Sequence, residues 1–307
     1  MERGAIDIDA LPGGFDLQST VESGQSYLWN RADGRTYETD AAHGGDAWYW
    51  TTVRPDDRPD PVVIRARQTD GRLEWESHVD AVPHLRRLLR LDDDLAAIAD
   101  AAPDDPLIRD AFDAYRGMRL VRDPPFGCLI SFICSAQMRV GRIYRMQRAL
   151  RETYGEAVAF DGRTYRAYPT PAVLSAATEG ALREVGLGYR APYVAETAAM
   201  VADGAADPAA ARELPYEEAR EYLTQFVGVG EKVADCVLLF SLDFLEAVPL
   251  DTWIRSTIEE YYPECDRGSY AETSRAIRAA FGGEYAGYVQ TYVFHFLRNG
   301  GEPVEPV

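Results

Sequence analysis

The sequence predicts an α+β protein, in which an N-terminal antiparallel β-sheet domain over residues 1–84 precedes an all-helical region of two subdomains over residues 85–307. Three observations predict this division. Short β-type runs separated by turn residues fill residues 15–76. From His84 onward, apolar residues recur instead at the spacing of amphipathic helices. Two of the helical stretches are separated by a Val-Gly-Val-Gly turn, which is typical of a helix-hairpin-helix.

The N-terminal domain is expected to contain strands at Ser26–Trp29, Ala47–Val53 and Val62–Arg67, because turn residues such as an Asp-Gly pair separate these runs. The first run follows Gly24 closely. By residue type alone, Gly24 is interpreted as a glycine at the entry of a strand.

The helical region begins with apolar residues at helical spacing and continues with one nearly uniform apolar stretch. The spaced positions are Leu85, Leu88, Leu89, Leu95, Ile98, Leu107, Ile108 and Phe112. Phe126–Ala136 is nearly all apolar, which predicts a helix that is buried on every side.

A basic segment overlaps this buried helix. Residues 116–151 hold eight arginines and one aspartate, whereas the whole chain has a net charge of −18. Five arginines recur at every third position from Arg139 to Arg151, and such a row drifts by about 60° per step around a helix. Two or three of them can therefore meet one ligand such as the DNA backbone. The alternative is a solvated helix face.

Length and composition indicate a globular protein. With 307 residues and 46% hydrophobic content, the chain can form two or three domains. It has no signal segment and no apolar run of about eighteen residues, so we expect a soluble, cytoplasmic and nucleoid-associated protein without membrane contact. The four cysteines are scattered without Cys-x-x-Cys spacing, so we expect free thiols and no metal site built from side chains.

The net charge of −18 argues against nucleic acid binding, because such binding depends largely on lysine and arginine. An acidic and lysine-poor surface is also what a cytoplasm of molar salt favours, since the Debye length at about 1 M is about 3 Å. We therefore interpret the charge as halophilic. Under this interpretation, DNA binding depends on backbone amides, stacking and shape.

The predicted helix-hairpin-helix at residues 216–242 carries the first candidate catalytic residue. Gly228 and Gly230 leave the backbone amides of the turn and of the next helix open, a geometry that holds a phosphate oxygen. Lys232 lies in the first turn of that helix, where the helix dipole favours the free, nucleophilic amine. It is the only lysine beside 31 arginines. We interpret it as functional, the alternative being an ordinary surface lysine.

Asp251 is the second candidate catalytic residue. The helix after the hairpin carries the chain out by about 15 Å, and the eight residues after it can span about 26 Å on the way back. Asp251 can therefore lie beside Lys232. It also precedes a helical stretch at Thr252–Tyr261, where aspartate is a favourable N-cap. One carboxylate can serve both roles.

The longest motif of the chain contains both candidates. It reads Leu-Thr-Gln-Phe-Val-Gly-Val-Gly-Glu-Lys-Val-Ala-Asp-Cys and, after an apolar run, Ala-Val-Pro-Leu-Asp. This motif resembles the helix-hairpin-helix DNA glycosylases, and most closely 8-oxoguanine DNA glycosylase. The resemblance implies a bifunctional DNA glycosylase and AP lyase. Lys232 would attack C1′ of the damaged nucleotide, Asp251 would stabilise the developing sugar cation, and the Schiff base would permit β-elimination.

Two further motifs resemble the base-recognition residues of the family. In Ser-Gly-Gln-Ser-Tyr-Leu-Trp at residues 23–29, the carbonyl of Gly24 would accept the N7 hydrogen of oxidised guanine. On a predicted C-terminal helix, Gln290 and Phe294 share one face at i, i+4. By resemblance, Gln290 would bind the Watson–Crick edge of the flipped base, and Phe294 would stack on it opposite Cys236. The alternative is a core phenylalanine beside a buried glutamine.

Residues for the rest of the duplex follow from a Gly-Leu-Gly-Tyr-Arg-Ala motif. By resemblance, Tyr189 would wedge into the base stack, while Arg190 and Arg142 would contact the widowed cytosine. The sequence departs from the family at two positions. Gln137 replaces an asparagine and is longer by one methylene, which weakens a strict preference for cytosine, and Trp253 replaces a histidine that contacts a phosphate.

The expected substrate is double-stranded DNA that contains 8-oxoguanine or abasic sites, bound by a monomer. No redox cofactor is implied, and the iron–sulfur loop of endonuclease III is absent because only Cys265 follows Asp251. By resemblance, the hairpin carbonyls of Phe226 and Gly228 would hold a structural Na⁺ or K⁺. Two alternatives stay open. One is a glycosylase for other damaged bases on the same scaffold, and the other is a non-catalytic helix-hairpin-helix DNA-binding protein.

Overall fold

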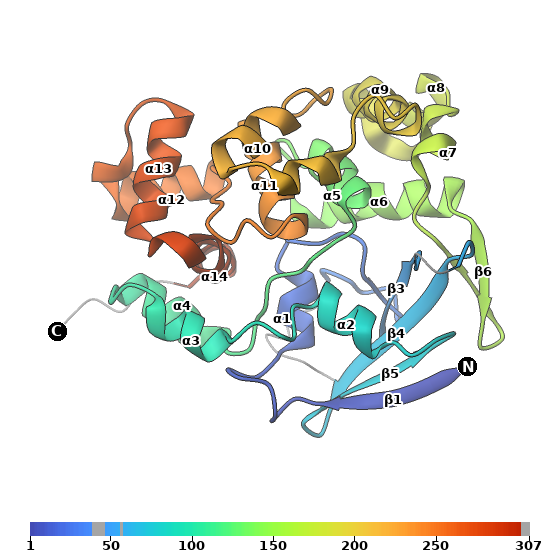
Figure 1. The fold of residues 1–307 in the computed structure, drawn as a ribbon, viewed down its shortest axis with the longest axis horizontal. Helices are drawn as coiled ribbons and strands as arrows, with labels where there is room; N and C mark the ends of the chain where they lie inside the picture. The colour runs from blue at the N-terminus through green and yellow to red at the C-terminus, as the bar shows by residue number, and fades with distance from the viewer. Residues whose placement is uncertain (39–46, 56–57, 302–307) are drawn as a thin grey trace.

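The computed structural model describes residues 1–38, 47–55 and 58–301, and it begins with a five-stranded antiparallel sheet. The strands are β1 (Glu2–Asp7), β2 (Asn30–Arg31), β3 (Tyr49–Val53), β4 (Val62–Thr69) and β5 (Arg72–Ser77), in the order β1-β5-β4-β3-β2 (Figure 1). Asp70 and Gly71 join β4 to β5 with φ values of 49° and 72°. Positive φ at both positions gives the twist that a tight hairpin needs. The expected N-terminal antiparallel sheet is confirmed.

Two helices contribute to the core of this sheet. They are α1 (Leu17–Glu22) and α2 (Val82–Leu88), and both place leucines in one buried cluster with Ile64 and Leu73 of the sheet. Asp16 caps α1 by accepting a hydrogen bond from the Ser19 amide at 2.7 Å. One apolar face of the sheet is therefore covered by two helices, one between β1 and β2 in the chain and one after β5.

The predicted strand at Ser26–Trp29 is wrong, because this stretch is a loop and strand pairing begins at Asn30. The reason is the buried side chain of Gln25, which supplies the loop with hydrogen bonds in place of a strand ladder. Its Nε2 donates to the Thr20 carbonyl at 2.9 Å, and its Oε1 accepts from the Val121 amide at 2.8 Å. The glycine before it ends α1 and is not a strand entry.

The helical region contains a single large apolar core. Its helices are α3 (Leu95–Ala101), α4 (Pro106–Ala114), α5 (Pro125–Ile133), α6 (Val140–Tyr154), α7 (Pro171–Ser175), α8 (Glu179–Leu182), α9 (Ala191–Ala202), α10 (Tyr216–Leu223), α11 (Glu231–Ser241), α12 (Thr252–Tyr261), α13 (Tyr270–Ala280) and α14 (Ala286–Arg298). As predicted, α5 is buried almost throughout. It packs against α11 in the middle of the molecule.

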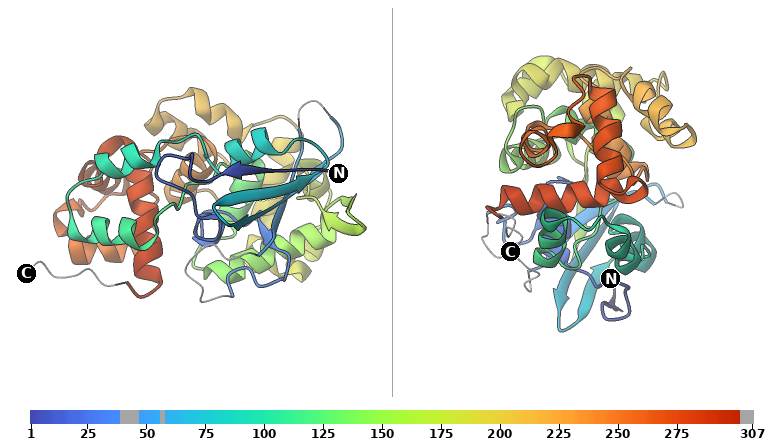
Figure 2. Two further views of the ribbon diagram at one scale, coloured as in Figure 1. Left: turned by 90° about the horizontal axis from the view of Figure 1, so that it is seen from below. Right: turned by 90° about the vertical axis from the view of Figure 1, so that its left-hand side faces the viewer.

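The helices form two groups on either side of α11. Figure 1 shows α5–α9 on one side and α12–α14 on the other. The early helices α3 and α4 join the C-terminal group, because α4 packs along α14, and both views of Figure 2 place them together. The expected two-subdomain arrangement is confirmed. Within the described part of the chain, no helix has the length and apolarity needed to cross a bilayer.

A second sheet, which was not predicted, interrupts the helices. The strands β6 (Ala157–Phe160) and β7 (Arg163–Arg166) form a hairpin around an Asp-Gly turn. This hairpin packs on the N-terminal sheet through a buried cluster that includes Val63 and Phe160. His78 Nε2 lies 3.0 Å from the Ala159 carbonyl oxygen across the same contact. The Asp-Gly pair between alternating residues is the signal that could have predicted it.

Candidate active site

The helix-hairpin-helix is formed by α10, a turn and α11, as the sequence predicts. Gly228 has a φ of +83°, and a Cβ on it would lie 2.8 Å from the ring of Tyr193. A side chain here would therefore meet both backbone strain and a steric clash. Gly230 is the N-cap of α11 in an extended conformation. The first amides of α11 have no acceptor within the helix, as at any helix N-terminus.

Lys232 and Asp251 lie on the same cavity, which has a volume of about 430 Å³. Lys232 is half-buried, donates a hydrogen bond from Nζ to Ser135 Oγ at 2.9 Å, and has its Nζ 5.6 Å from the ring centroid of Phe132. Asp251 is the N-cap of α12 and accepts from the Ile254 amide at 2.9 Å. The cap is therefore confirmed, and it fixes the carboxylate at the cavity wall.

Burial governs the ionisation of the acids in this cavity. It raises the pKa of Asp251 above its ordinary value, and the hydrogen bond from Ile254 and the charge of Lys232 act in the opposite direction. Burial also raises the pKa of the Cys236 thiol to about 12. Cys236 is therefore a neutral thiol at physiological pH and presents a polarisable apolar surface to a ligand.

The four expected base-recognition residues also line this cavity. They are Gly24, Cys236, Gln290 and Phe294. Gln290 is 5% exposed, and among the residues that the structure describes its Oε1 has no hydrogen-bond partner. Leaving a buried acceptor unpaired costs about 1–3 kcal/mol. A ligand that donates a hydrogen bond at this point would recover that free energy, as the edge of a flipped base would.

Gly24 is held in place by an arginine that the sequence reasoning missed. Arg298 of α14 donates from Nη1 to the Ser23 carbonyl at 2.7 Å and lies 5.3 Å from the ring centroid of Phe294. Gly24 has a φ of +100°, and a Cβ on it would lie 2.9 Å from the same Nη1. The position therefore accepts glycine alone. Its carbonyl belongs to a loop that is fixed against the wall of the cavity.

The expected DNA-contact residues divide into exposed and buried ones. Gln137, with a φ of 55°, and Arg142 are exposed, and Tyr189 is 53% exposed. Arg190 is only 2% exposed, because its guanidinium donates to the Ala136 carbonyl and stacks 4.2 Å from the Tyr189 ring centroid. In this conformation Arg190 supports Tyr189 and does not reach the surface.

The basic row of α6 is likewise divided. Arg142, Arg145 and Arg148 are exposed, whereas Arg151 is 3% exposed and packs over Trp50. Three arginines of the helix are therefore exposed to solvent, and so is Arg139, which precedes the helix.

A second, more open cavity of about 440 Å³ adjoins the first and shares Lys232 and Asp251 with it. Arg139, Arg255 and Trp253 also line it, and Trp253 is 50% exposed. Among the described residues, neither arginine pairs with a carboxylate, although many others do. Arg255 was not predicted. An arginine one turn after Asp251 is a signal that could have indicated it.

Family models match nearly the whole chain in two segments. The model described as HhH-GPD superfamily base excision DNA repair protein matches residues 130–281. The model of the 8-oxoguanine DNA glycosylase N-terminal domain matches residues 8–129. A probable N-glycosylase/DNA lyase of Methanothermobacter thermautotrophicus is 33% identical over 94% of this chain and 95% of its own length. The chain belongs to the HhH-GPD superfamily.

Other members of the superfamily agree in sequence and in fold. The N-glycosylase/DNA lyase of Saccharomyces cerevisiae is 31% identical over 80% of this chain and 68% of its own length. A crystal structure of the Clostridium acetobutylicum 8-oxoguanine glycosylase/lyase, in complex with double-stranded DNA containing cytosine opposite 8-oxoG, superposes with a TM-score of 0.78. It is 26% identical and covers 92% of each chain. The α+β architecture is therefore that of a superfamily branch with the N-terminal sheet domain.

Proposed function

We propose that this protein excises 8-oxoguanine from duplex DNA and then cleaves the strand at the abasic site. One observation carries the proposal. The single lysine of the chain lies at the start of a helix, on the same cavity as a half-buried carboxylate and an unpaired glutamine oxygen. A glycosylase with lyase activity needs three parts: a nucleophile, a carboxylic acid group and a cavity that can hold a nucleobase.

In the proposed reaction, the Lys232 amine attacks C1′ of the damaged nucleotide and the bond from C1′ to the base breaks. The base leaves with the electron pair of that bond and takes up a proton. The Asp251 carboxylate stabilises the positive charge that develops on the sugar, because it is held close by the α12 cap. The C1′–O4′ bond of the lysine adduct then breaks, O4′ takes up a proton as the nitrogen loses one, and a Schiff base forms between the nitrogen and C1′. Loss of a C2′ proton then breaks the bond from C3′ to the 3′ phosphate, which leaves with the electron pair.

Recognition of the lesion is assigned to the walls of the same cavity. Gly24 offers the carbonyl of a loop fixed by Arg298, and a carbonyl binds the N7 hydrogen that 8-oxoguanine has and guanine lacks. Gln290 offers an amide with a free oxygen, and Phe294 and Cys236 offer apolar surface for the two faces of the base.

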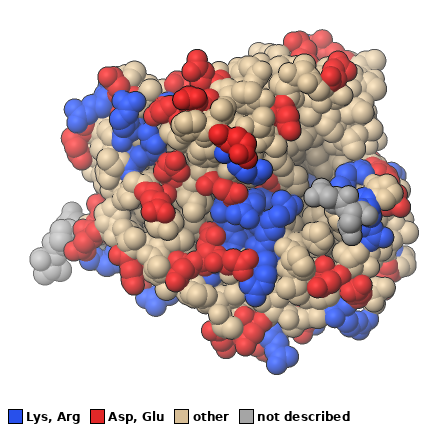
Figure 3. Space-filling model, viewed as in Figure 1, with Lys and Arg blue, Asp and Glu red and all other residues tan. Residues whose placement is uncertain are grey.

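The wider DNA-binding surface is proposed around Arg139, Arg142 and Arg255. Tyr189 would wedge into the base stack, and Gln137 would lie near the position that the flipped nucleotide leaves. Carboxylates are scattered over the face of the molecule that Figure 3 shows, in keeping with the net charge of −18. Several arginines elsewhere are neutralised by acids, and Arg90 and Arg122 share Asp243. Unpaired arginines beside the cavity leave positive charge where the DNA phosphates would lie.

Two further features belong to the proposal. A monovalent cation would bind at the hairpin carbonyls of Phe226 and Gly228, in a protein that acts as a monomer. The net charge of −18 and the near absence of lysine support function in molar salt, where screening weakens repulsion from DNA.

Cleavage assays on matched duplexes test this function. We expect base release and strand nicking with 8-oxoguanine, and neither product with uracil or with alkylated bases, which lack the N7 hydrogen and C8 oxygen together. Release of an alkylated base at a rate similar to that of 8-oxoguanine would assign the cavity to another lesion. Duplex binding without release of any base would make the protein a DNA-binding module.

Replacing Phe294 by alanine tests the recess. We expect affinity for an 8-oxoguanine duplex to fall by about 1–3 kcal/mol, because a base loses its stacking surface. Cleavage of a duplex with a preformed abasic site should continue, since no base has to be stacked there. Phe244 provides a matched control, because it is a half-buried phenylalanine that does not line the cavity. An equal loss on both substrates would show that Phe294 is only a core residue.

A further inference from the structure

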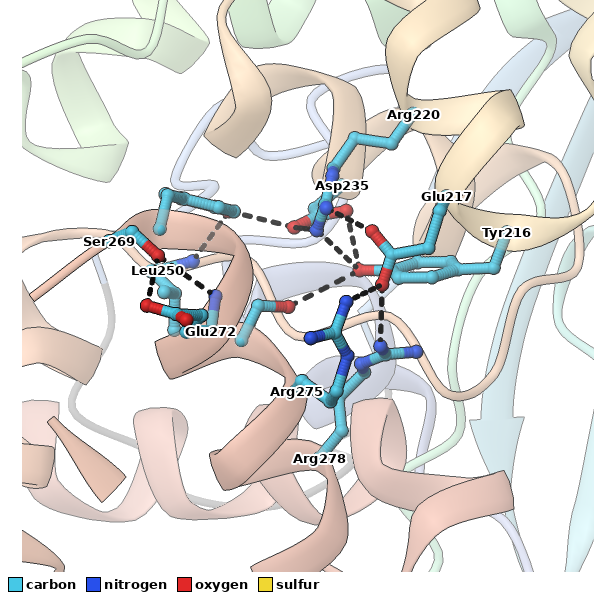
Figure 4. Close-up of polar contacts among 11 residues, drawn as sticks. Tyr216, Glu217, Arg220, Asp235, Leu250, Ser269, Glu272, Arg275 and Arg278 are labelled. Carbon is cyan, nitrogen blue, oxygen red and sulfur yellow. Dashed lines mark hydrogen bonds and ion pairs between the residues drawn. The ribbon is translucent and has the colours of Figure 1, made fainter. Parts of the chain in front are cut away.

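A buried carboxylate that the proposed reaction does not use lies next to the active site. Asp235 of α11 is fully buried and stands three residues after Lys232. Its Oδ1 accepts a hydrogen bond from the Tyr216 hydroxyl at 2.8 Å, and its Oδ2 accepts one from the Tyr270 hydroxyl at 2.7 Å. Figure 4 shows this carboxylate among polar side chains from three helices. Burying a carboxylate costs free energy, and the two hydrogen bonds from the tyrosines offset part of that cost.

The Tyr270 hydroxyl continues the network to the catalytic loop. It accepts a hydrogen bond from the Leu250 amide at 3.1 Å. Leu250 immediately precedes Asp251 and is 3% exposed. One hydroxyl thus joins the carboxylate of α11 to the backbone of the residue before the catalytic acid. Because Asp235 draws the hydroxyl proton toward itself, the oxygen becomes a stronger acceptor for the amide.

An outer layer of charges holds this network in place. Arg220 Nη1 lies 3.9 Å from Asp235 Oδ2, and its other nitrogen donates to Glu217. Glu217 also accepts from Arg278 at 3.0 Å and lies 3.7 Å from Arg275 (Figure 4). The network therefore fixes α10, α11 and α13 to one another, and the catalytic loop is attached to it through Tyr270 alone among these side chains.

We propose that Tyr270 and Asp235 are positioning residues that set the distance between the Asp251 carboxylate and the Lys232 amine. Lys232 is carried by α11, which also carries Asp235. Asp251 is carried by the loop that Tyr270 attaches to Asp235. Both reacting groups are therefore connected to Asp235, Lys232 through α11 and Asp251 through Tyr270. This inference rests on the proposed function, because it concerns the base-release step of that reaction.

The test compares two tyrosines that contact the same carboxylate. Tyr270→Phe removes the hydroxyl that holds the Leu250 amide, whereas Tyr216→Phe removes the hydroxyl on the other carboxylate oxygen and leaves that amide bonded. We expect single-turnover base release to fall by about 10- to 100-fold in Tyr270→Phe, since displacement by about 1 Å can cost about 100-fold. Tyr216→Phe should stay within about twofold, and both variants should bind the lesion duplex like the wild type.

A double-mutant cycle shows whether Tyr270 acts through Asp251. In an Asp251→Asn background, we expect Tyr270→Phe to cause less than about a twofold further loss, because the group that it positions has already been neutralised. A full additional loss would overturn the proposal, as would equal rates of Tyr270→Phe and Tyr216→Phe. Thermal unfolding of each variant is the control for correct folding. If the wild type fails to release 8-oxoguanine at all, the proposed function fails, and that outcome is separate from any ratio between variants.

Discussion

Lys232→Gln is expected to abolish the covalent trapping of the protein on 8-oxoguanine duplex by borohydride, and to abolish strand nicking with it. The variant keeps a polar side chain of similar length in the first turn of α11 but has no amine to form a Schiff base. Removal of a catalytic nucleophile typically costs about 10⁴-fold or more, so base release should become undetectable in a single-turnover assay. The substitution also changes the hydrogen bond that Lys232 Nζ donates to Ser135 Oγ.

The chain offers a simple control, because it has no other lysine. The α-amino group of Met1 is the one competing amine. Acetylation of this terminus should leave trapping unchanged. If trapping survives in Lys232→Gln, or if base release continues at the wild-type rate, Lys232 is not the nucleophile and the bifunctional assignment is wrong.

Asp251→Asn is expected to slow base release by about 100- to 1000-fold while leaving lesion binding nearly unchanged. The carboxylate acts when positive charge develops on the sugar, which occurs in the transition state and not in the bound complex. Asparagine is as good an N-cap as aspartate, so the hydrogen bond to Ile254 and the start of α12 are retained. Rate constants and dissociation constants measured on the same duplex separate the two effects. A parallel loss of binding and thermal stability would mean that Asp251 acts mainly as a cap.

The same residue predicts a pH dependence. Burial raises the pKa of Asp251, so the group takes up a proton at a higher pH than a surface aspartate does. Base release requires the ionised form, and the rate should therefore fall as the pH decreases through this raised pKa. The acidic limb of the profile should disappear in Asp251→Asn. An unchanged limb in that variant would assign it to a different group.

The local patterns of the sequence were sufficient to predict the hairpin and to expect Lys232 and Asp251 near each other, and the structure places both on one cavity. The Val-Gly-Val-Gly turn needs positive φ at Gly228, and the lone lysine and the aspartate before α12 follow at fixed distances along the chain. These features depend on neighbours in sequence, which is why periodicity and capping rules predict them.

The missed features depend on contacts between distant segments. Arg298 fixes the Ser23 carbonyl across 275 residues, and Gln25 bonds the Arg119 carbonyl across 94. Strand β1 was missed because only Ile6 of its six residues is buried, so that it lacks the apolar alternation of a half-buried strand. Arg190 carries a charge that suits DNA, but the carbonyl of Ala136, in the turn after α5, binds it instead.

The β6–β7 hairpin also has a consequence for how the protein is made. It covers Trp50 and Val63 of the N-terminal sheet, yet it is synthesised only after α3, α4, α5 and α6. At about 5–20 residues per second, the ribosome leaves this part of the sheet uncovered for several seconds. The nascent N-terminal domain therefore emerges with an exposed apolar patch, and it becomes complete only when the middle of the chain folds back onto it.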